Sequence, residues 1–76
     1  MKAIDLNNIF TYHAPFGNQA ERYEKLRAQV KFLAMIVLEL TPECAEQTIA
    51  IRKLQEAVMF ANAAIAINEK PDEVVT

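Results

Sequence analysis

The sequence predicts an all-α fold: an antiparallel αα-hairpin of two long helices behind a short N-terminal helical segment, assembled as a homo-oligomer. Two long stretches carry apolar side chains at alternating steps of three and four, which is the spacing of one helical face. The composition, 53% hydrophobic with one glycine and three prolines, suits a domain rich in regular structure. A chain of 76 residues buries a modest share of its surface, so residues 1–76 form one domain at most and need support from outside the hairpin.

The N-terminal segment, residues 1–18, should contain one short helical turn capped by Asp5. We expect Leu6, Ile9 and Phe10 to dock from this turn onto the hairpin or onto a neighbouring chain. Such docking would remove apolar side chains from water.

The first long helix is predicted over about residues 19–40. Asn18 can accept a backbone N–H and Glu21 can reach back to the start of the helix, which is the capping-box pattern, and Gly17 supplies the preceding turn. The apolar face of this helix consists of Tyr23, Leu26, Val30, Leu33, Val37 and Leu40.

The second long helix is predicted over about residues 42–69. Thr41 is a good N-cap and Pro42 fits the first helical position, so the chain reverses here without a loop. Pro71 blocks continuation of the helix, and we expect the tail, residues 70–76, to fray. The apolar face of this helix consists of Ile51, Leu54, Val58, Ala61 and Ile65.

Two helices cannot cover all the apolar side chains that they carry. Beyond the two facing stripes, further large apolar residues point to other sectors: Phe32, Met35, Ile36, Ile49, Met59, Phe60 and Ile67. A solvated two-helix unit rarely exposes so much apolar surface. We therefore expect other copies of the chain to cover it in an obligate homo-oligomer.

The charge pattern excludes one class of partner and leaves another open. A net charge of −2 argues against binding to DNA or RNA polymers, which need a surplus of cations. Four of the eight Lys and Arg residues nevertheless lie within ten positions, namely Arg22, Lys25, Arg27 and Lys31. This cluster is compatible with a small anionic ligand, although the same residues could form an ordinary solvated surface.

Three features of the sequence indicate the cellular compartment in which we expect the protein. No apolar run approaches the roughly 18 residues of a membrane span, and the start of the chain lacks a signal-peptide pattern. Cys44 is the only cysteine, so no disulfide can form within the chain. We expect a cytoplasmic protein that does not associate with membranes.

No residue pattern predicts catalysis, a metal site or a cofactor. Glu21-x-x-Glu24 and Glu43-x-x-Glu46 are spaced like the magnesium-binding ExxE pairs of all-α nucleotide pyrophosphohydrolases. In an antiparallel hairpin, however, Glu21 and Glu43 would lie about 30 Å apart within one chain. The chain has no serine for its histidine to activate and no glycine-rich phosphate loop. We expect no enzyme.

The loop Tyr12-His13-x-Pro15 has two interpretations. It could be a linker that aromatic burial pins against the hairpin. It could also be a shelf on which a nucleobase stacks, since the tyrosine ring offers a π-face and the neighbouring basic cluster could hold phosphate.

The segments "YHAPFGNQAERYEKLR" and "KLQEAVMFANAAIA" resemble the helical-hairpin family of phage cyclic-nucleotide sponges, the anti-CBASS and anti-Thoeris proteins. The resemblance covers about residues 8–69. It implies a non-enzymatic protein that sequesters cyclic oligonucleotide messengers of bacterial immunity in the cytoplasm of the infected host cell. It also implies a compact homo-oligomer, typically a hexamer, with cyclic dinucleotides held between protomers.

The resemblance assigns roles to residues of the opening stretch. Tyr12 matches the aromatic residue that stacks on a base, and Arg27 matches the basic residue that meets phosphate, with Lys25 as the alternative. His13 and Pro15 match the loop that shapes the pocket. Further matches, with ligand or packing roles left open, are Arg22, Tyr23 and Asn62.

The chain departs from the family pattern at two positions. Phe60 stands where the family has tryptophan, and Ile67 stands where it has arginine. In some relatives a basic residue in this region helps to bind cyclic trinucleotides, and isoleucine cannot bond phosphate. The resemblance therefore extends to cyclic dinucleotides and leaves cyclic trinucleotides, base preference and linkage open. An oligomeric helical adaptor that binds a protein partner is the alternative function.

Overall fold

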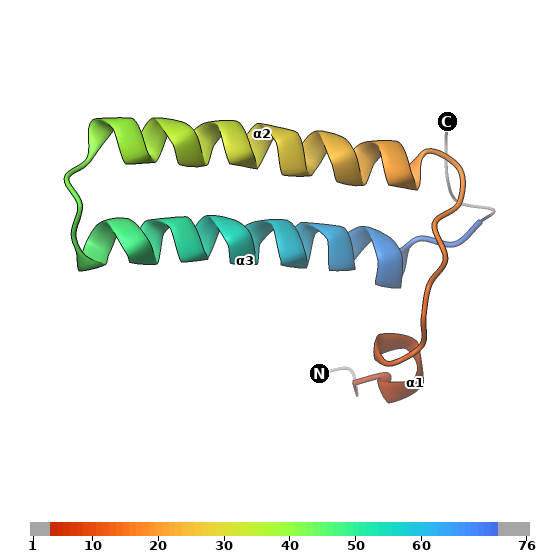
Figure 1. Cartoon of the computed structure of the whole chain (residues 1–76). Coiled ribbons are helices and arrows are strands. Elements are labelled where there is room, and N and C mark those ends of the chain that lie inside the picture. The colour runs from red at the N-terminus through yellow and green to blue at the C-terminus, as the bar shows by residue number, and fades with distance from the viewer. Residues whose placement is uncertain (1–3, 72–76) are drawn as a thin grey trace.

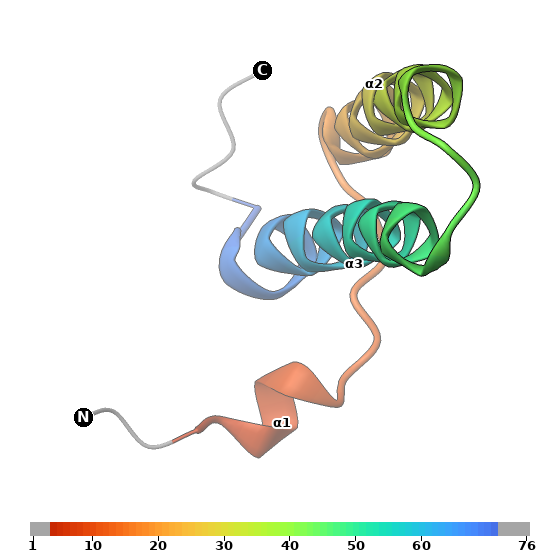
Figure 2. The same cartoon turned by 90° about the vertical axis from the view of Figure 1, so that its left-hand side faces the viewer.

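The computed structural model describes residues 4–71, and these residues form a helical hairpin with a short helix beside it. The elements are α1 (Leu6–Ile9), α2 (Gln19–Leu40) and α3 (Ala45–Asn68). Helices α2 and α3 run antiparallel side by side, and α1 lies apart from them on the α3 side (Figures 1 and 2). The predicted all-α hairpin is therefore confirmed. Most of the predicted frayed tail lies outside the described residues.

Helix α1 has the predicted cap, but its apolar side chains do not dock onto the hairpin of their own chain. Asp5 Oδ1 accepts a hydrogen bond from the backbone N–H of Asn8 at 3.1 Å, as an N-cap does. Leu6, Ile9 and Phe10 nevertheless remain exposed, so they do not dock onto the hairpin of their own chain. A four-residue helix offers too short an apolar face to hold itself against α3.

Helix α2 spans the predicted residues, but its start is built differently from a capping box. Asn18 occupies the N-cap position without a side-chain capping bond. Its Oδ1 instead accepts a hydrogen bond from Arg22 Nε at 3.0 Å. The guanidinium one turn along the helix thus competes successfully for the oxygen that a capping box would use.

Helix α3 begins at Ala45, three residues later than predicted, because Thr41 belongs to α2. Thr41 is the C-cap of α2, and both its backbone N–H and its hydroxyl donate to the carbonyl oxygen of Val37. Gln47 Nε2 donates to the Thr41 carbonyl oxygen at 3.1 Å and so closes the turn. The N-cap of α3 is Cys44, which makes no side-chain capping bond.

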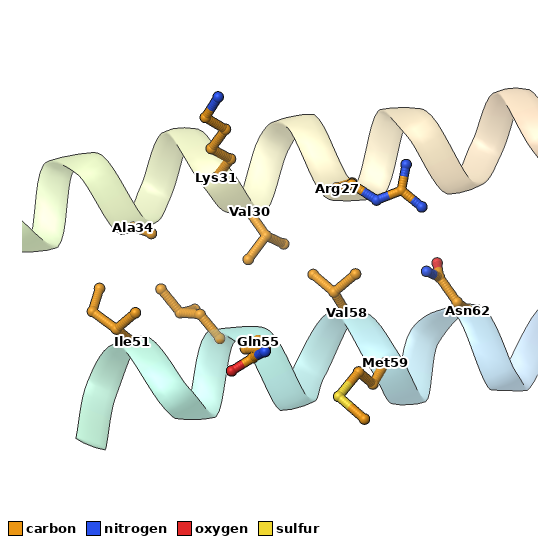
Figure 3. Close-up of a pocket in the computed structure, with 10 residues that line it drawn as sticks. Arg27, Val30, Lys31, Ala34, Ile51, Gln55, Val58, Met59 and Asn62 are labelled. Carbon is orange, nitrogen blue, oxygen red and sulfur yellow. The ribbon is translucent and has the colours of Figure 1, made fainter. Parts of the chain in front are cut away.

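The predicted stripes form the contact between α2 and α3, with two exceptions. Most members of both stripes are partly buried, whereas Leu33 and Leu40 are exposed. Ala34 takes the place expected for Leu33 and points toward α3 (Figure 3). A step of four residues from Val30 turns by about 40° past a full circle, whereas a step of three falls short by about 60°, so Ala34 lies nearer the seam.

The hairpin has no buried apolar core within the described residues. No hydrophobic side chain there is fully buried, and the only buried residue is the polar Gln19. Five of the side chains predicted to lie off the seam are exposed: Phe32, Met35, Ile49, Met59 and Phe60. Neither long helix of the described region has the apolar length needed to cross a bilayer.

Candidate ligand-binding site

Apart from Pro15, the residues predicted to bind a ligand line three surface regions of the chain. Tyr12 and His13 line a hollow at the open end of the hairpin. Arg27 lines a groove between α2 and α3, and Arg22 and Lys25 line a third hollow beside Ile65. A single chain therefore does not bring all of them to one pocket.

The first hollow, which we call the Tyr12 hollow, has a volume of about 580 Å³ and combines the loop before α2 with the end of α3. Its lining includes Tyr12, His13 and Phe16 from the loop and Ile67 and Glu69 from the other side. The Tyr12 side chain is 83% exposed, which rules out the interpretation that this ring is pinned against its own hairpin. Its π-face is open to a ligand or to another chain.

The loop around His13 is held by backbone oxygens. His13 Nε2 donates to the carbonyl oxygen of Asn8 at 2.8 Å, and Asn8 Nδ2 donates to the carbonyl oxygen of Ile67 at 2.9 Å. His13 therefore shapes the loop by bonding Asn8 of α1, which is itself bonded to the end of α3. Pro15 is exposed and does not line the Tyr12 hollow, although it restricts the backbone two residues from His13.

The second region is an open groove of about 450 Å³ between the long helices, which we call the Arg27 groove (Figure 3). Val30 and Val58 point toward each other across its floor, and Asn62 points from α3 toward α2 (Figure 3). Asn62 Oδ1 is buried and has no hydrogen-bond partner among the described residues. A buried acceptor in this state is costly until a donor reaches it.

Arg27 lacks a carboxylate partner within residues 4–71. The ion pairs of that region are Arg22–Glu69 and Lys53–Glu56. The Arg27 side chain is therefore free to contact an anion at the mouth of the groove. Lys31 lines the same groove one turn further along α2, but its side chain extends away from α3 (Figure 3).

Arg22 is committed to an intramolecular pair that sequence reasoning missed. Arg22 Nη1 donates to Glu69 Oε2 at 2.8 Å, and Nη2 donates to Oε1 at 2.5 Å, so the pair is bidentate. Lys25 forms no such pair in the described region and remains exposed in the third hollow, which has a volume of about 380 Å³.

The pair fixes the charge state of both partners. Hydrogen bonds from Arg22 and then from Gln19 lower the pKa of Glu69 to about 2, below its ordinary value of 4.5. The same bond to Glu69 raises the pKa of Arg22. At neutral pH, Glu69 is therefore an anion next to a cation, and little net charge from this pair faces the Tyr12 hollow.

Arg22 and Glu69 left one signal in the sequence. Neither Arg22 nor Glu69 has an oppositely charged residue three or four positions away, so neither can pair along its own helix. In an antiparallel hairpin the start of the first helix lies opposite the end of the second, which brings these two residues together. The burial of Gln19 has no comparable signal.

The arrangement offers binding chemistry: an exposed aromatic ring in the Tyr12 hollow, and in the Arg27 groove a guanidinium without an ion-pair partner in the described region and the unsatisfied Asn62 oxygen. Among residues 4–71 no group of three or more His, Cys, Asp or Glu side chains is placed to hold a metal ion. Glu21 and Glu43 lie near opposite ends of the hairpin (Figure 1).

Comparison with known proteins identifies the family. No curated protein and no solved structure matches the chain. The family model described as Acb2/Tad1, hairpin domain, matches residues 2–66, which include α1, α2 and most of α3. The chain therefore belongs to the Acb2/Tad1 hairpin-domain family, the anti-CBASS and anti-Thoeris family that its sequence resembles.

Proposed function

We propose that this protein is a phage counter-defence sponge that binds and sequesters cyclic dinucleotides without cleaving them. The observation that carries the proposal is membership of the Acb2/Tad1 hairpin-domain family over residues 2–66. The protein acts in the cytoplasm of the infected bacterial cell, where the messengers of CBASS-type immunity are made. Bound messenger no longer reaches its effector.

Tyr12 stacks on a nucleobase and Arg27 binds phosphate. The exposure of the Tyr12 ring supports the first role, because an aromatic face that its own chain leaves open can take a base. The absence of an ion-pair partner for Arg27 in the described region supports the second. Lys25 is the alternative phosphate contact, and His13 and Pro15 shape the loop.

The complete pocket lies between protomers of a homo-oligomer, which we propose to be a hexamer. Two features support assembly. The described hairpin has no apolar core of its own, and large apolar side chains such as Phe32 and Phe60 are exposed on it. Within one chain, the Tyr12 hollow and the Arg27 groove are separate surfaces. A neighbouring chain would therefore have to supply the remaining ligand contacts at each of them.

Sequestration without cleavage fits the residues at these surfaces. A phosphodiesterase needs a nucleophile, a general base or a metal site next to the bound phosphate. The proposed phosphate contact, Arg27, is a guanidinium, which stays protonated and neither attacks nor abstracts a proton.

A thermal-shift panel of cyclic dinucleotides tests the proposal. A ligand that binds the folded protein raises its stability by RT ln(1 + [L]/Kd), so at least one member of the panel should raise the melting temperature in a concentration-dependent way. Linear dinucleotides of the same bases serve as the matched control. If no member of the panel shifts the transition, the sponge function is wrong.

An oligomeric helical adaptor is the second candidate, and the exposed apolar side chains of α2 and α3 favour it. An adaptor would not respond to any cyclic dinucleotide. The same panel therefore separates the two functions.

A further inference from the structure

Gln19 ties the loop that carries Tyr12 to the end of α3. It is 1% exposed, and it is the one buried residue of the described chain. Its Oε1 accepts from the backbone N–H of Phe16 at 3.2 Å, while its own backbone N–H donates to the Phe16 carbonyl oxygen at 3.0 Å. Its Nε2 donates to Glu69 Oε1 at 3.2 Å. The amide thus satisfies both the loop and the carboxylate.

Arg22 completes the arrangement. Its guanidinium holds both oxygens of Glu69 and also donates from Nε to Asn18 Oδ1 at 3.0 Å. We call Gln19, Arg22 and Glu69 the clasp. The Gln19 side-chain oxygen bonds the Phe16 backbone and its nitrogen bonds Glu69, and the planar fork of Arg22 is aimed at protein acceptors.

The other end of the loop is tied to α3 as well. His13 bonds the Asn8 carbonyl oxygen, and Asn8 bonds the Ile67 carbonyl oxygen. Residues 13–16 are therefore held at both ends to the final turn of α3 and its C-cap, Glu69. Tyr12 immediately precedes this fixed stretch, and both Tyr12 and Glu69 line the Tyr12 hollow.

Resting on the proposed function, we propose that Gln19 and Glu69 are positioning residues, which through the clasp hold the loop so that the Tyr12 ring is ready to stack on a nucleobase. A loop that is already ordered loses less conformational entropy when it binds. Glu69 lies beyond residues 2–66, so the clasp closes through a residue outside the part of the chain that the family model matches. The lowered pKa of Glu69 keeps its carboxylate charged to more acidic pH than an ordinary glutamate, whose pKa is 4.5.

The first test measures binding of 3′,3′-cyclic GMP–AMP to Glu69→Gln by calorimetry. This substitution keeps the shape of the side chain but removes the charge that holds Arg22 and Gln19, so binding should weaken by about tenfold, the scale of one lost charge-assisted contact. The matched control is Glu56→Gln, which makes the same chemical change in the exposed Lys53–Glu56 pair, whose atoms lie 3.7 Å apart. The control should bind like the parent.

A double-mutant cycle tests whether Glu69 acts through Tyr12. In a Tyr12→Ala background, Glu69→Gln should cost almost no further affinity, because the ring that the clasp positions is gone. If Glu69→Gln costs the same with and without the Tyr12 ring, Glu69 does not act through the loop and the proposal is overturned. The proposal is also overturned if Glu69→Gln binds like the parent.

Gln19→Met provides a second variant that leaves the Arg22–Glu69 pair in place. Methionine fills a similar volume but cannot bond Phe16 or Glu69, so the Phe16 amide should exchange its hydrogen faster and binding should again weaken. Unchanged exchange and binding would overturn the proposal even if Glu69→Gln fails to fold. If the parent binds no cyclic dinucleotide, both the proposed function and this inference are wrong. If the parent binds and the variants bind equally well, only this inference is wrong.

Discussion

At the open end of the hairpin, Gln19 is 1% exposed and the bidentate Arg22–Glu69 pair joins α2 to the end of α3. Along the length of the hairpin, in contrast, Phe32 and Phe60 are 62% and 69% exposed. The polar end is satisfied within one chain. The apolar side chains along α2 and α3 are not covered within one chain, because no hydrophobic side chain of the described region is buried. The comparison indicates that polar contacts within one chain hold the loop that carries Tyr12, whereas the hydrophobic surface is left exposed, as the proposed homo-oligomer would require.

The largest expected effect is loss of assembly when a charge is introduced among the exposed apolar side chains of α2. Phe32→Glu would place a carboxylate where we expect another copy to pack, and burying an unpaired charge costs several kcal/mol, so the oligomer should dissociate. Light scattering at micromolar concentration measures the mass. Phe32→Leu, which keeps an apolar side chain at the same position, should remain assembled. A parent that is a stable monomer would contradict the proposed assembly.

Loss of the phosphate contact should come next. Arg27→Ala removes a charge-assisted contact, so binding of a cyclic dinucleotide should weaken by about 1.5 to 3 kcal/mol. The dependence of affinity on salt should also flatten, because one screened charge pair is gone. Titrations at low and high ionic strength measure both effects. Lys25→Ala is the matched comparison, and a larger loss there would move the phosphate contact to Lys25.

Loss of the stacking ring should have a similar or smaller effect of a different kind. Tyr12→Ala should weaken binding by about 1 to 3 kcal/mol with little dependence on salt, as base–aromatic contacts do. Tyr12→Phe keeps the ring and should bind nearly as the parent does. The same titrations measure these variants, and an unaffected Tyr12→Ala would leave the exposed ring without a role in binding.

The smallest expected effect is the pH dependence of the stability that the Arg22–Glu69 pair contributes. The pKa of Glu69 is about 2 in the folded chain, below its ordinary value of 4.5. The carboxylate therefore contributes its full stabilisation above about pH 4.5 and loses it as the pH falls from there through about 2. Thermal unfolding from pH 7 to 2 should show a steeper loss of stability below pH 4.5 for the parent than for Glu69→Gln. Parallel curves would show that the pair does not stabilise the fold.

The sequence was sufficient for the helices but not for their junctions. Helix α2 spans the predicted residues because its apolar period is regular, although the predicted capping box does not form. The start of α3 was predicted too early, because Thr41 can cap either of two helices and its hydroxyl is used by α2. Local patterns cannot decide between two such partners.

The candidate site was predictable in parts. Tyr12 stands out in the sequence by residue type, and Arg27 by its match to the family pattern. The structure finds the Tyr12 ring exposed and the Arg27 side chain without an ion-pair partner in the described region. The Arg22–Glu69 pair was missed because its members lie 47 positions apart and meet only through the antiparallel pairing of the helices. The choice of Ala34 over Leu33 at the seam depends on helix phase, which spacing alone leaves open.

The most direct test of the central claim is recovery of the bound ligand. The parent protein is incubated for increasing times with the member of the cyclic dinucleotide panel that raises its melting temperature most, free nucleotide is removed by gel filtration, and the complex is heated and analysed by chromatography. We predict that the protein retains the nucleotide and that heating returns it intact at every time point. Absence of retained nucleotide, or linear products that grow with incubation time, would contradict sequestration without cleavage.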